Sequence, residues 1–128
     1  MKNKFFLIFL LSIVLYSVFY LTNPQETRNV KIENKIYKLL IADSPEEYTK
    51  GLMNVRKLNN ADGMVFLFED SQVRNFWNQN TLVDLDIYWM QDDNVVGKSF
   101  LPSIETTKVP VTINSEVPVN RVVELIRN

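Results

Sequence analysis

Cysteine and histidine are both absent from this chain of 128 residues. Without histidine, the protein lacks the side chain that most readily exchanges a proton near neutral pH, and it lacks the usual Ser-His-Asp triad. Without cysteine, it has no thiol nucleophile, no disulfide, and no zinc or copper site built from nitrogen and sulfur ligands. Chemistry would have to come from carboxyl, amino or hydroxyl groups, or from a hard metal bound through oxygen. We expect no metal site and no other cofactor.

A block of basic residues is absent as well. The chain has 14 Lys and Arg residues and 15 Asp and Glu residues, for a net charge of −1. Proteins that bind nucleic acids usually carry a cluster of basic residues, so we expect no nucleic-acid partner. The length allows one domain rather than two, and the sequence shows neither an internal repeat nor a low-complexity segment.

The longest hydrophobic run lies at the N-terminus and covers 17 residues without a charge, Phe5 to Leu21. As a helix it would be roughly 26 Å long, close to the ~30 Å hydrocarbon core of a bilayer. A cleaved signal peptide needs small residues at its cleavage site, and only Ser17 is small near the far end of the run. We therefore expect an uncleaved transmembrane helix, with a cleaved signal and a buried soluble helix as alternatives.

The charges beside this run predict its orientation. Lys2 and Lys4 precede it and no acidic residue accompanies them. By the positive-inside rule, the N-terminus stays in the cytoplasm and the remainder of the chain lies outside the cytoplasmic membrane. The predicted organisation is a single-pass anchor at 1–22 that crosses through residues 5–21, a polar linker at 23–29, and a domain at 30–128.

From residue 30 onward, short apolar runs alternate with turn-forming residues. The run at 64–68, MVFLF, is apolar at every position, which indicates a buried central strand. Six or seven short strands joined by hairpin-like turns favour a mainly β domain, either an antiparallel sandwich or a partly closed barrel. We expect the strands at 30–32, 35–42, 64–68, 73–77, 85–90, 95–101 and 121–126.

One short helix is predicted between the second and third of these strands. Ser44 can cap it, Pro45 fits its first position, and Glu47 completes a capping box. Gly51 is a natural end because it readily adopts a left-handed backbone. Two turns of helix are not stable alone, so we expect Tyr48 and nearby apolar residues to pack against the sheet.

Four stretches have the order and spacing of motifs from one protein family. Residues 41–47 read IADSPEE, and GLM follows at 51–53. Residues 62–66 read DGMVF, residues 76–87 read FWNQNTLVDLDI, and residues 121–125 read RVVEL. They resemble the I-A-D-T-P-E-E…G-L-M, E-G-M-L-F, F-W-M-K-N-T-x-x-P-L-D-I and Y-V-L-E-L motifs of the bacterial and archaeal domain of unknown function 192 family. The resemblance implies a compact, mainly β, jelly-roll-like sandwich that is often exported, and it implies no established activity.

The chain departs from the family pattern at several positions. Asn78 and Gln79 replace the Met-Lys of the central motif, and Asp84 replaces its Pro. Val55 stands where the family commonly has Arg. The sequence ends at Asn128, whereas the family usually continues through a G-x-x-x-G-D segment.

The stretch from 76 to 90 holds the candidate ligand-binding residues. Asn80, Thr81 and Asp86 match the family motif, and Trp77 and Trp89 flank them. The three polar side chains could simply stabilise turns by bonding to nearby backbone groups, and the two tryptophans could belong to the core. Alternatively, these five residues could line a pocket in which an aromatic ring receives a sugar or an apolar ligand.

Two classes of function remain, together with a structural alternative. The first is a non-catalytic binding module outside the membrane, whose partner would be a glycan or an envelope protein. The second is a carbohydrate-directed hydrolase that uses Asp86 and Glu124, because glycoside hydrolysis needs two carboxyl groups roughly 5–9 Å apart. The structural alternative is that the domain assembles with a partner through an exposed edge strand. No catalytic residue can be assigned from the sequence.

Overall fold

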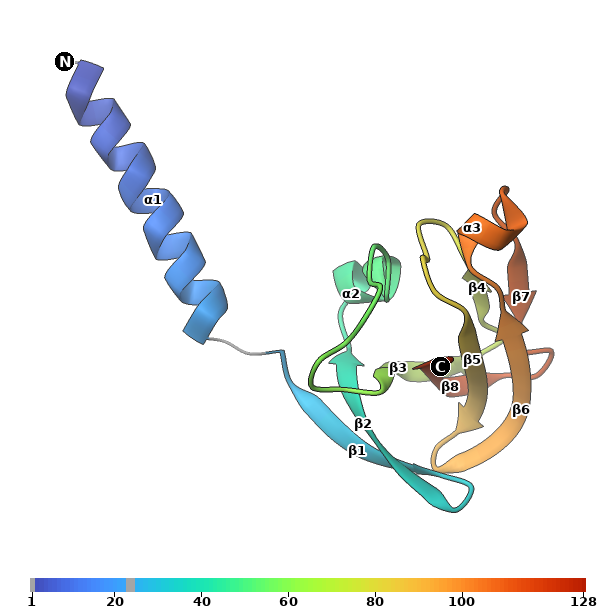
Figure 1. The fold of residues 1–128 in the computed structure, drawn as a ribbon. Helices are drawn as coiled ribbons and strands as arrows, with labels where there is room; N and C mark the ends of the chain where they lie inside the picture. The colour runs from blue at the N-terminus through green and yellow to red at the C-terminus, as the bar shows by residue number, and fades with distance from the viewer. Residues whose placement is uncertain (1, 23–24) are drawn as a thin grey trace.

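The computed structural model describes residues 2–22 and 25–128. Helix α1, Lys2–Thr22, stands apart from the rest of the chain (Figure 1), and its side chains from Phe6 to Val18 are exposed. In this described part, no helix meets the length and apolar character needed to cross a membrane. The predicted linker at 23–29 lies partly outside the described residues, and the first strand begins at Thr27 rather than at Val30.

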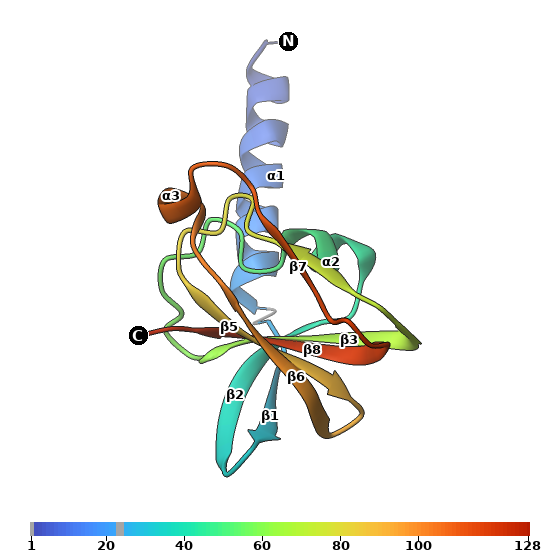
Figure 2. The ribbon, with the colours of Figure 1, turned by 90° about the vertical axis from the view of Figure 1, so that its right-hand side faces the viewer.

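A curved sheet of six strands forms the centre of the domain (Figures 1 and 2), in the order β1-β2-β3-β8-β5-β6. A second sheet holds only β4 and β7. The prediction of a mainly β fold is confirmed. The strands are β1 Thr27–Ile32, β2 Lys35–Ala42, β3 Gly63–Gln72, β4 Asn75–Trp77, β5 Leu85–Gln91, β6 Asn94–Leu101, β7 Thr112–Asn114 and β8 Val119–Ile126.

The main sheet differs from the prediction in the direction of one strand pair. It is not wholly antiparallel, because β2 and β3 run parallel, with Leu39 opposite Gly63 and Ala42 opposite Phe66. A parallel pair needs a long crossover, and the helix and loop between these strands provide one. The described strands also form no closed barrel, because β1 and β6 remain the two edges of the sheet.

The predicted helix is confirmed as α2, Pro45–Lys50. Its capping box is complete: the Glu47 N–H donates to Ser44 Oγ at 3.3 Å, and the Ser44 N–H donates to Glu47 Oε2 at 3.1 Å. The N–H of Asp43 also donates to this carboxylate and is the main cause that lowers the pKa of Glu47. Gly51 ends the helix with φ of +45°. The prediction of only one short helix is incomplete, because α3 adds a single turn at Ile104–Thr107.

Two strand boundaries were predicted wrongly in the middle of the chain. Residues 69–71 lie between the predicted strands 64–68 and 73–77 but belong to β3, whose pairing with β8 is irregular between Leu67 and Gln72. The strand expected at 73–77 shortens to β4 and pairs with β7 instead of β3. The distant strand β8 occupies the edge of β3 that a local hairpin would have used.

Both faces of the main sheet are covered by apolar side chains. Successive residues of a strand point to opposite faces, so Met64 and Phe66 join one cluster and Val65 joins the other. This explains why residues 64–68 are apolar at every position. We call the face packed against α2, β4 and β7 the helix-side face. The opposite face, which includes Val30 and Ile32 of the β1–β2 hairpin, is the hairpin-side face.

Candidate functional site

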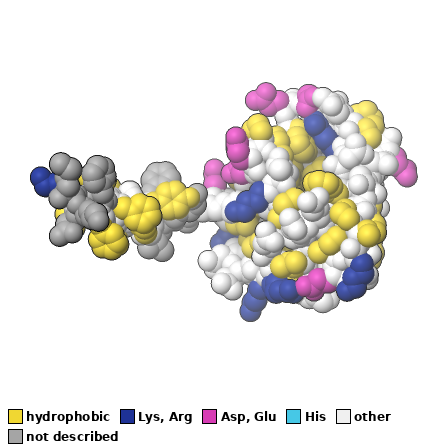
Figure 3. All heavy atoms as spheres, turned by 90° about the horizontal axis from the view of Figure 1, so that it is seen from above, with side chains coloured by type: hydrophobic (Ala, Val, Ile, Leu, Met, Phe, Trp, Pro, Cys, Tyr) yellow, Lys and Arg dark blue, Asp and Glu magenta, His cyan; other side chains and the backbone are white. Residues whose placement is uncertain are grey.

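A cleft of about 450 Å³ opens on the helix-side face, between the end of α2 and strand β4. The space-filling view from the side of α2 and α3 shows hydrophobic atoms exposed in the middle of the β domain, with acidic groups around its outline (Figure 3). We call the hollow the Glu124 cleft, after the carboxyl group that lines it. Its aromatic lining residues are Tyr48, Phe66, Phe68, Phe76 and Trp77.

Glu124 lies in β8, in the middle of the sheet, with only 5% of its surface exposed. Its neighbours across the two adjoining strands are the apolar residues Met64 and Ile87. The backbone N–H of Leu52 bonds to the carboxyl group, but Oε2 has no hydrogen-bond partner among the described residues. Burial raises the pKa of Glu124 to about 8. The group is therefore mostly a neutral carboxylic acid near neutral pH, with one oxygen unused.

Gly51 lies close to this carboxyl group. A Cβ at this position would lie 3.6 Å from Glu124 Oε2 and 3.2 Å from Cζ of Phe66. The positive φ of +45° also favours glycine here. Glycine therefore suits this position both for its backbone angle and for its close contact with the ring of Phe66.

The aromatic walls are held by contacts with one another. The rings of Phe66 and Phe76 meet edge to face at 4.9 Å, and Phe76 meets Trp89 in the same way at 5.6 Å. Tyr48 lies 4.6 Å from the ring of Phe68 and donates its hydroxyl hydrogen to the carbonyl of Leu67 at 2.5 Å. Burial is the main cause that raises the pKa of Tyr48. These contacts hold the rings in fixed positions.

The guanidinium group of Arg74 packs on one of the aromatic side chains that line the cleft. The guanidinium of Arg74 lies 3.9 Å from the ring centre of Phe68. It pairs with Asp70 at 2.5 Å and donates to the carbonyl of Val119 at 3.4 Å. The charge of Arg74 is thus largely balanced by Asp70, outside the cleft lining.

Two of the five predicted ligand-binding residues line the cleft: Trp77, which is 49% exposed, and the buried Thr81. Asn80 is exposed and has a positive φ of 54°. Its carbonyl accepts the N–H of Asn54 at 2.8 Å, so it helps to join this loop to the end of α2. Trp89 lies in the core, where its Nε1 donates to Ser99 Oγ at 2.8 Å.

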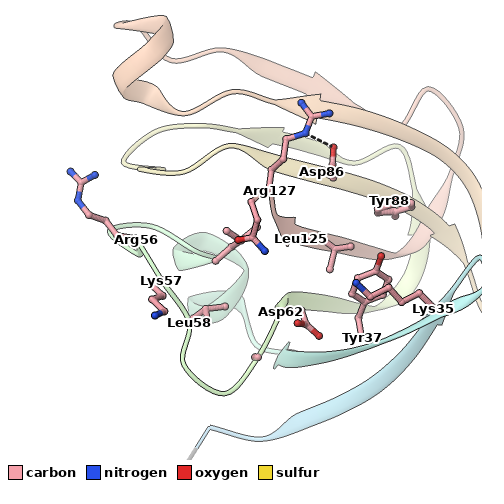
Figure 4. Close-up of a pocket in the computed structure, with 13 residues that line it drawn as sticks. Lys35, Tyr37, Arg56, Lys57, Leu58, Asp62, Asp86, Tyr88, Leu125 and Arg127 are labelled. Carbon is pink, nitrogen blue, oxygen red and sulfur yellow. Dashed lines mark ion pairs between the residues drawn. The ribbon is translucent and has the colours of Figure 1, made fainter.

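Asp86, the fifth residue, lies on the hairpin-side face. It is opposite Leu125, whereas Glu124 is opposite Ile87, so the two carboxyl groups point to opposite sides of the sheet. The proposed Asp86–Glu124 catalytic pair is therefore wrong. Asp86 lines a separate hollow of about 490 Å³ and forms an ion pair with Arg127 at 3.6 Å. Figure 4 shows this pair among the residues that line the hollow.

Sequence reasoning missed most of the cleft lining, above all Arg74, Phe68 and Phe76. One signal was present for Glu124, because it alternates with Val122 and Ile126 along an otherwise apolar strand face. A lone acid at such a position must be either partnered or functional. Within residues 2–22 and 25–128, no group of three or more acidic side chains could hold a metal ion.

Asn78 supports the loop that carries Thr81. It is fully buried, and its Nδ2 donates to the carbonyl of Pro102 at 2.9 Å and to Thr107 Oγ1 at 2.8 Å. Its Oδ1 accepts the N–H of Val111 at 2.8 Å. The segment around α3 is thereby fastened beside the cleft, although the family motif has an apolar Met at this position.

Comparison with known proteins agrees with this architecture. Residues 27–128 match the domain of unknown function 192 (DUF192) family, which is described as uncharacterized ACR. The chain belongs to this family. No curated protein matches the sequence significantly.

Two crystal structures resemble the DUF192 domain described above. One is a proposed transcription regulator from Sinorhizobium meliloti 1021, with 26% identity, a TM-score of 0.62, and 78% of each chain covered. The other is a protein of unknown function from Novosphingobium aromaticivorans DSM 12444, with 23% identity and a TM-score of 0.64. That match covers 80% of this chain and 73% of the other, and it supports the fold alone.

The stretches that resemble DUF192 motifs converge on the Glu124 cleft. The stretch at 51–53 lies at the rim, and Phe66 comes from the stretch at 62–66. Trp77 belongs to the central motif, and Glu124 belongs to the closing one. Four segments that are far apart in the sequence therefore contribute to one hollow, and this makes it the candidate site of the domain.

Proposed function

We propose that this DUF192 domain is a non-catalytic module that binds a small, largely apolar ligand in the Glu124 cleft. The observation that carries the proposal is the buried carboxyl oxygen of Glu124, which has no partner among the described residues and lines an aromatic cavity. A ligand that completes this hydrogen bond relieves a cost of about 1–3 kcal/mol. The ligand's apolar body gains further free energy by covering the rings.

The size and shape of the cleft support this proposal. Ligand pockets are typically hollows of about 300–1,000 Å³ with apolar walls and a few polar groups, and this one measures about 450 Å³. The exposed ring of Trp77 could stack on a sugar as well as on an apolar ligand. A glycan or a side chain of an envelope protein is therefore included among the candidate ligands.

A thermal-shift screen tests this function. The fragment 25–128 contains both core clusters, and it would be melted with short glycans and with small aromatic amines, alcohols and acids. A ligand at about 100 times its dissociation constant adds ~2.7 kcal/mol, which raises the melting temperature by several degrees. We expect Trp77→Ala to abolish the shift. Phe100→Ala is the matched control, because Phe100 is similarly exposed, at 43%, but does not line the cleft. An equal shift in both variants, or no shift with any compound, contradicts the proposal.

The proposal also places the domain outside the cytoplasmic membrane, held by residues 5–21. The uncharged run and the exposed apolar side chains of α1 support the anchor, and Lys2 and Lys4 support the orientation. We expect the full-length protein to sediment with membranes, to resist alkaline carbonate extraction and to dissolve in detergent. A variant with Leu11→Lys and Leu15→Lys should fail to insert, because a charge at the bilayer centre costs about 3 kcal/mol. Carbonate extraction of the unchanged protein would count against the anchor.

A further inference from the structure

We propose that the ligand of the Glu124 cleft is an organic cation, whose amino group binds against Glu124 while its apolar body packs on the aromatic walls. This inference rests on the proposed binding function and specifies the chemical class of the ligand. The ligand of the cleft is thus a protonated amine rather than a neutral or anionic compound.

The walls of the cleft suit a cation. The face of an aromatic ring carries partial negative charge and attracts a positive group within about 6 Å of its centre. Five aromatic side chains line the cleft. One of them, Phe68, already holds the guanidinium of Arg74 at 3.9 Å from its ring centre. The same wall therefore stabilises a positive charge within the protein itself.

The floor of the cleft supplies the group that becomes negatively charged when a cation binds. Glu124 is the sole acidic residue among the described residues that line the hollow. The other titratable side chains that face it are Tyr48, Lys50 and Arg74, while its strand neighbours, Met64 and Ile87, do not titrate. Asp70 balances the charge of Arg74. An ammonium group that entered would therefore find one carboxyl group, with its Oε2 unused.

Binding of a cation requires a proton to leave. The empty site holds Glu124 as the neutral acid at neutral pH, because burial keeps its pKa at about 8. An arriving ammonium stabilises the carboxylate, and the carboxyl proton passes to solvent. A neutral alcohol would bind the protonated acid and release nothing. A carboxylate ligand would oppose ionisation of Glu124.

Calorimetric titration of the full-length protein in a non-ionic detergent tests this inference. The probes are benzylamine, benzyl alcohol and benzoate, with heats of addition to empty micelles subtracted. We expect benzylamine to bind at least about tenfold more tightly than benzyl alcohol, and benzoate to bind most weakly. In two buffers with different ionisation enthalpies, benzylamine should release close to one proton per site at about pH 6.5, and benzyl alcohol should release none.

Glu124→Gln separates the inference from the proposed function. Glutamine keeps the shape and hydrogen-bonding capacity of the side chain but cannot ionise. We expect this variant to lose roughly tenfold in affinity for benzylamine and all proton release, so that benzylamine no longer binds more tightly than benzyl alcohol. If benzyl alcohol binds the unchanged protein as tightly as benzylamine does, the inference that the ligand is a cation is wrong, but the cleft remains a ligand-binding site. If none of the three probes binds, both proposals fail.

Discussion

Replacement of Gly63 by alanine is expected to prevent stable folding of the β domain. Gly63 lies in β3, and the backbone of the paired strand β8 is so close that an added Cβ would stand 1.9 Å from the carbonyl oxygen of Glu124. A backbone atom cannot move aside without separating the two strands. We expect a loss of about 4 kcal/mol or more, which is a large part of the total stability of a typical domain. Urea unfolding of the fragment 25–128, followed by tryptophan fluorescence, measures it.

Gly97→Ala is the matched control for this prediction. Its Cβ would lie 3.2 Å from Cδ1 of Trp89, which is a side-chain atom, and Gly97 lies in the edge strand β6. A side chain can shift by a few tenths of an ångström, so we expect a change within about 1 kcal/mol. If Gly63→Ala unfolds at the same urea concentration as the unchanged fragment, the close approach of the β8 backbone to Gly63 is incorrect.

The stability of the domain is expected to fall as the pH rises from about 5 to about 8. Glu124 causes this, because its pKa is about 8 in the folded state and close to its usual 4.5 in the unfolded state. In this window the folded protein binds more protons than the unfolded chain does, so raising the pH favours unfolding. Each pH unit within it costs up to about 1.4 kcal/mol, and we expect a total loss of about 3 to 4 kcal/mol.

Glu124→Gln should remove this pH dependence. Its unfolding free energy should be nearly constant from about pH 5 to about pH 8, and it should exceed that of the unchanged protein at the upper end. Glu47 does not obscure the result, because its lowered pKa affects stability only as the pH falls below its usual 4.5. A flat profile in the unchanged fragment would show that Glu124 is solvated or partnered. Urea unfolding at a series of pH values distinguishes these outcomes.

Glu124 is thus expected to lower the stability of the domain rather than to raise it. A carboxyl group that lowers the stability of its own domain as the pH rises from about 5 to about 8 does not serve to hold the sheet together. An isosteric amide should serve the fold better, so the acid is better explained by an interaction that the isolated domain does not make. Binding of an amine would reverse the penalty, because the carboxylate would then have a partner. Stability and ligand recognition are thus linked through one buried side chain.

Local features of the sequence determined several parts of this structure. The capping box of Ser44 and Glu47 and the glycine at position 51 specified α2, because their hydrogen bonds and backbone angles involve neighbouring residues. The apolar run at 64–68 indicated a strand buried on both faces, and β3 has that position. The order of the motifs identified the family. Each of these inferences needed only residues close in the sequence or a known spacing.

Strand pairing and the composition of the cleft were decided by tertiary structure. The insertion of β8 between β3 and β5 joins residues far apart in the chain, and alternation within one strand does not reveal its neighbours. The separation of Asp86 from Glu124 depends on the register of β5 against β8, where a shift of one residue would reverse every face. The cleft exists only because α2, β3, β4 and β8 meet on one side of the sheet, so its chemistry could not be recognised before the fold was known.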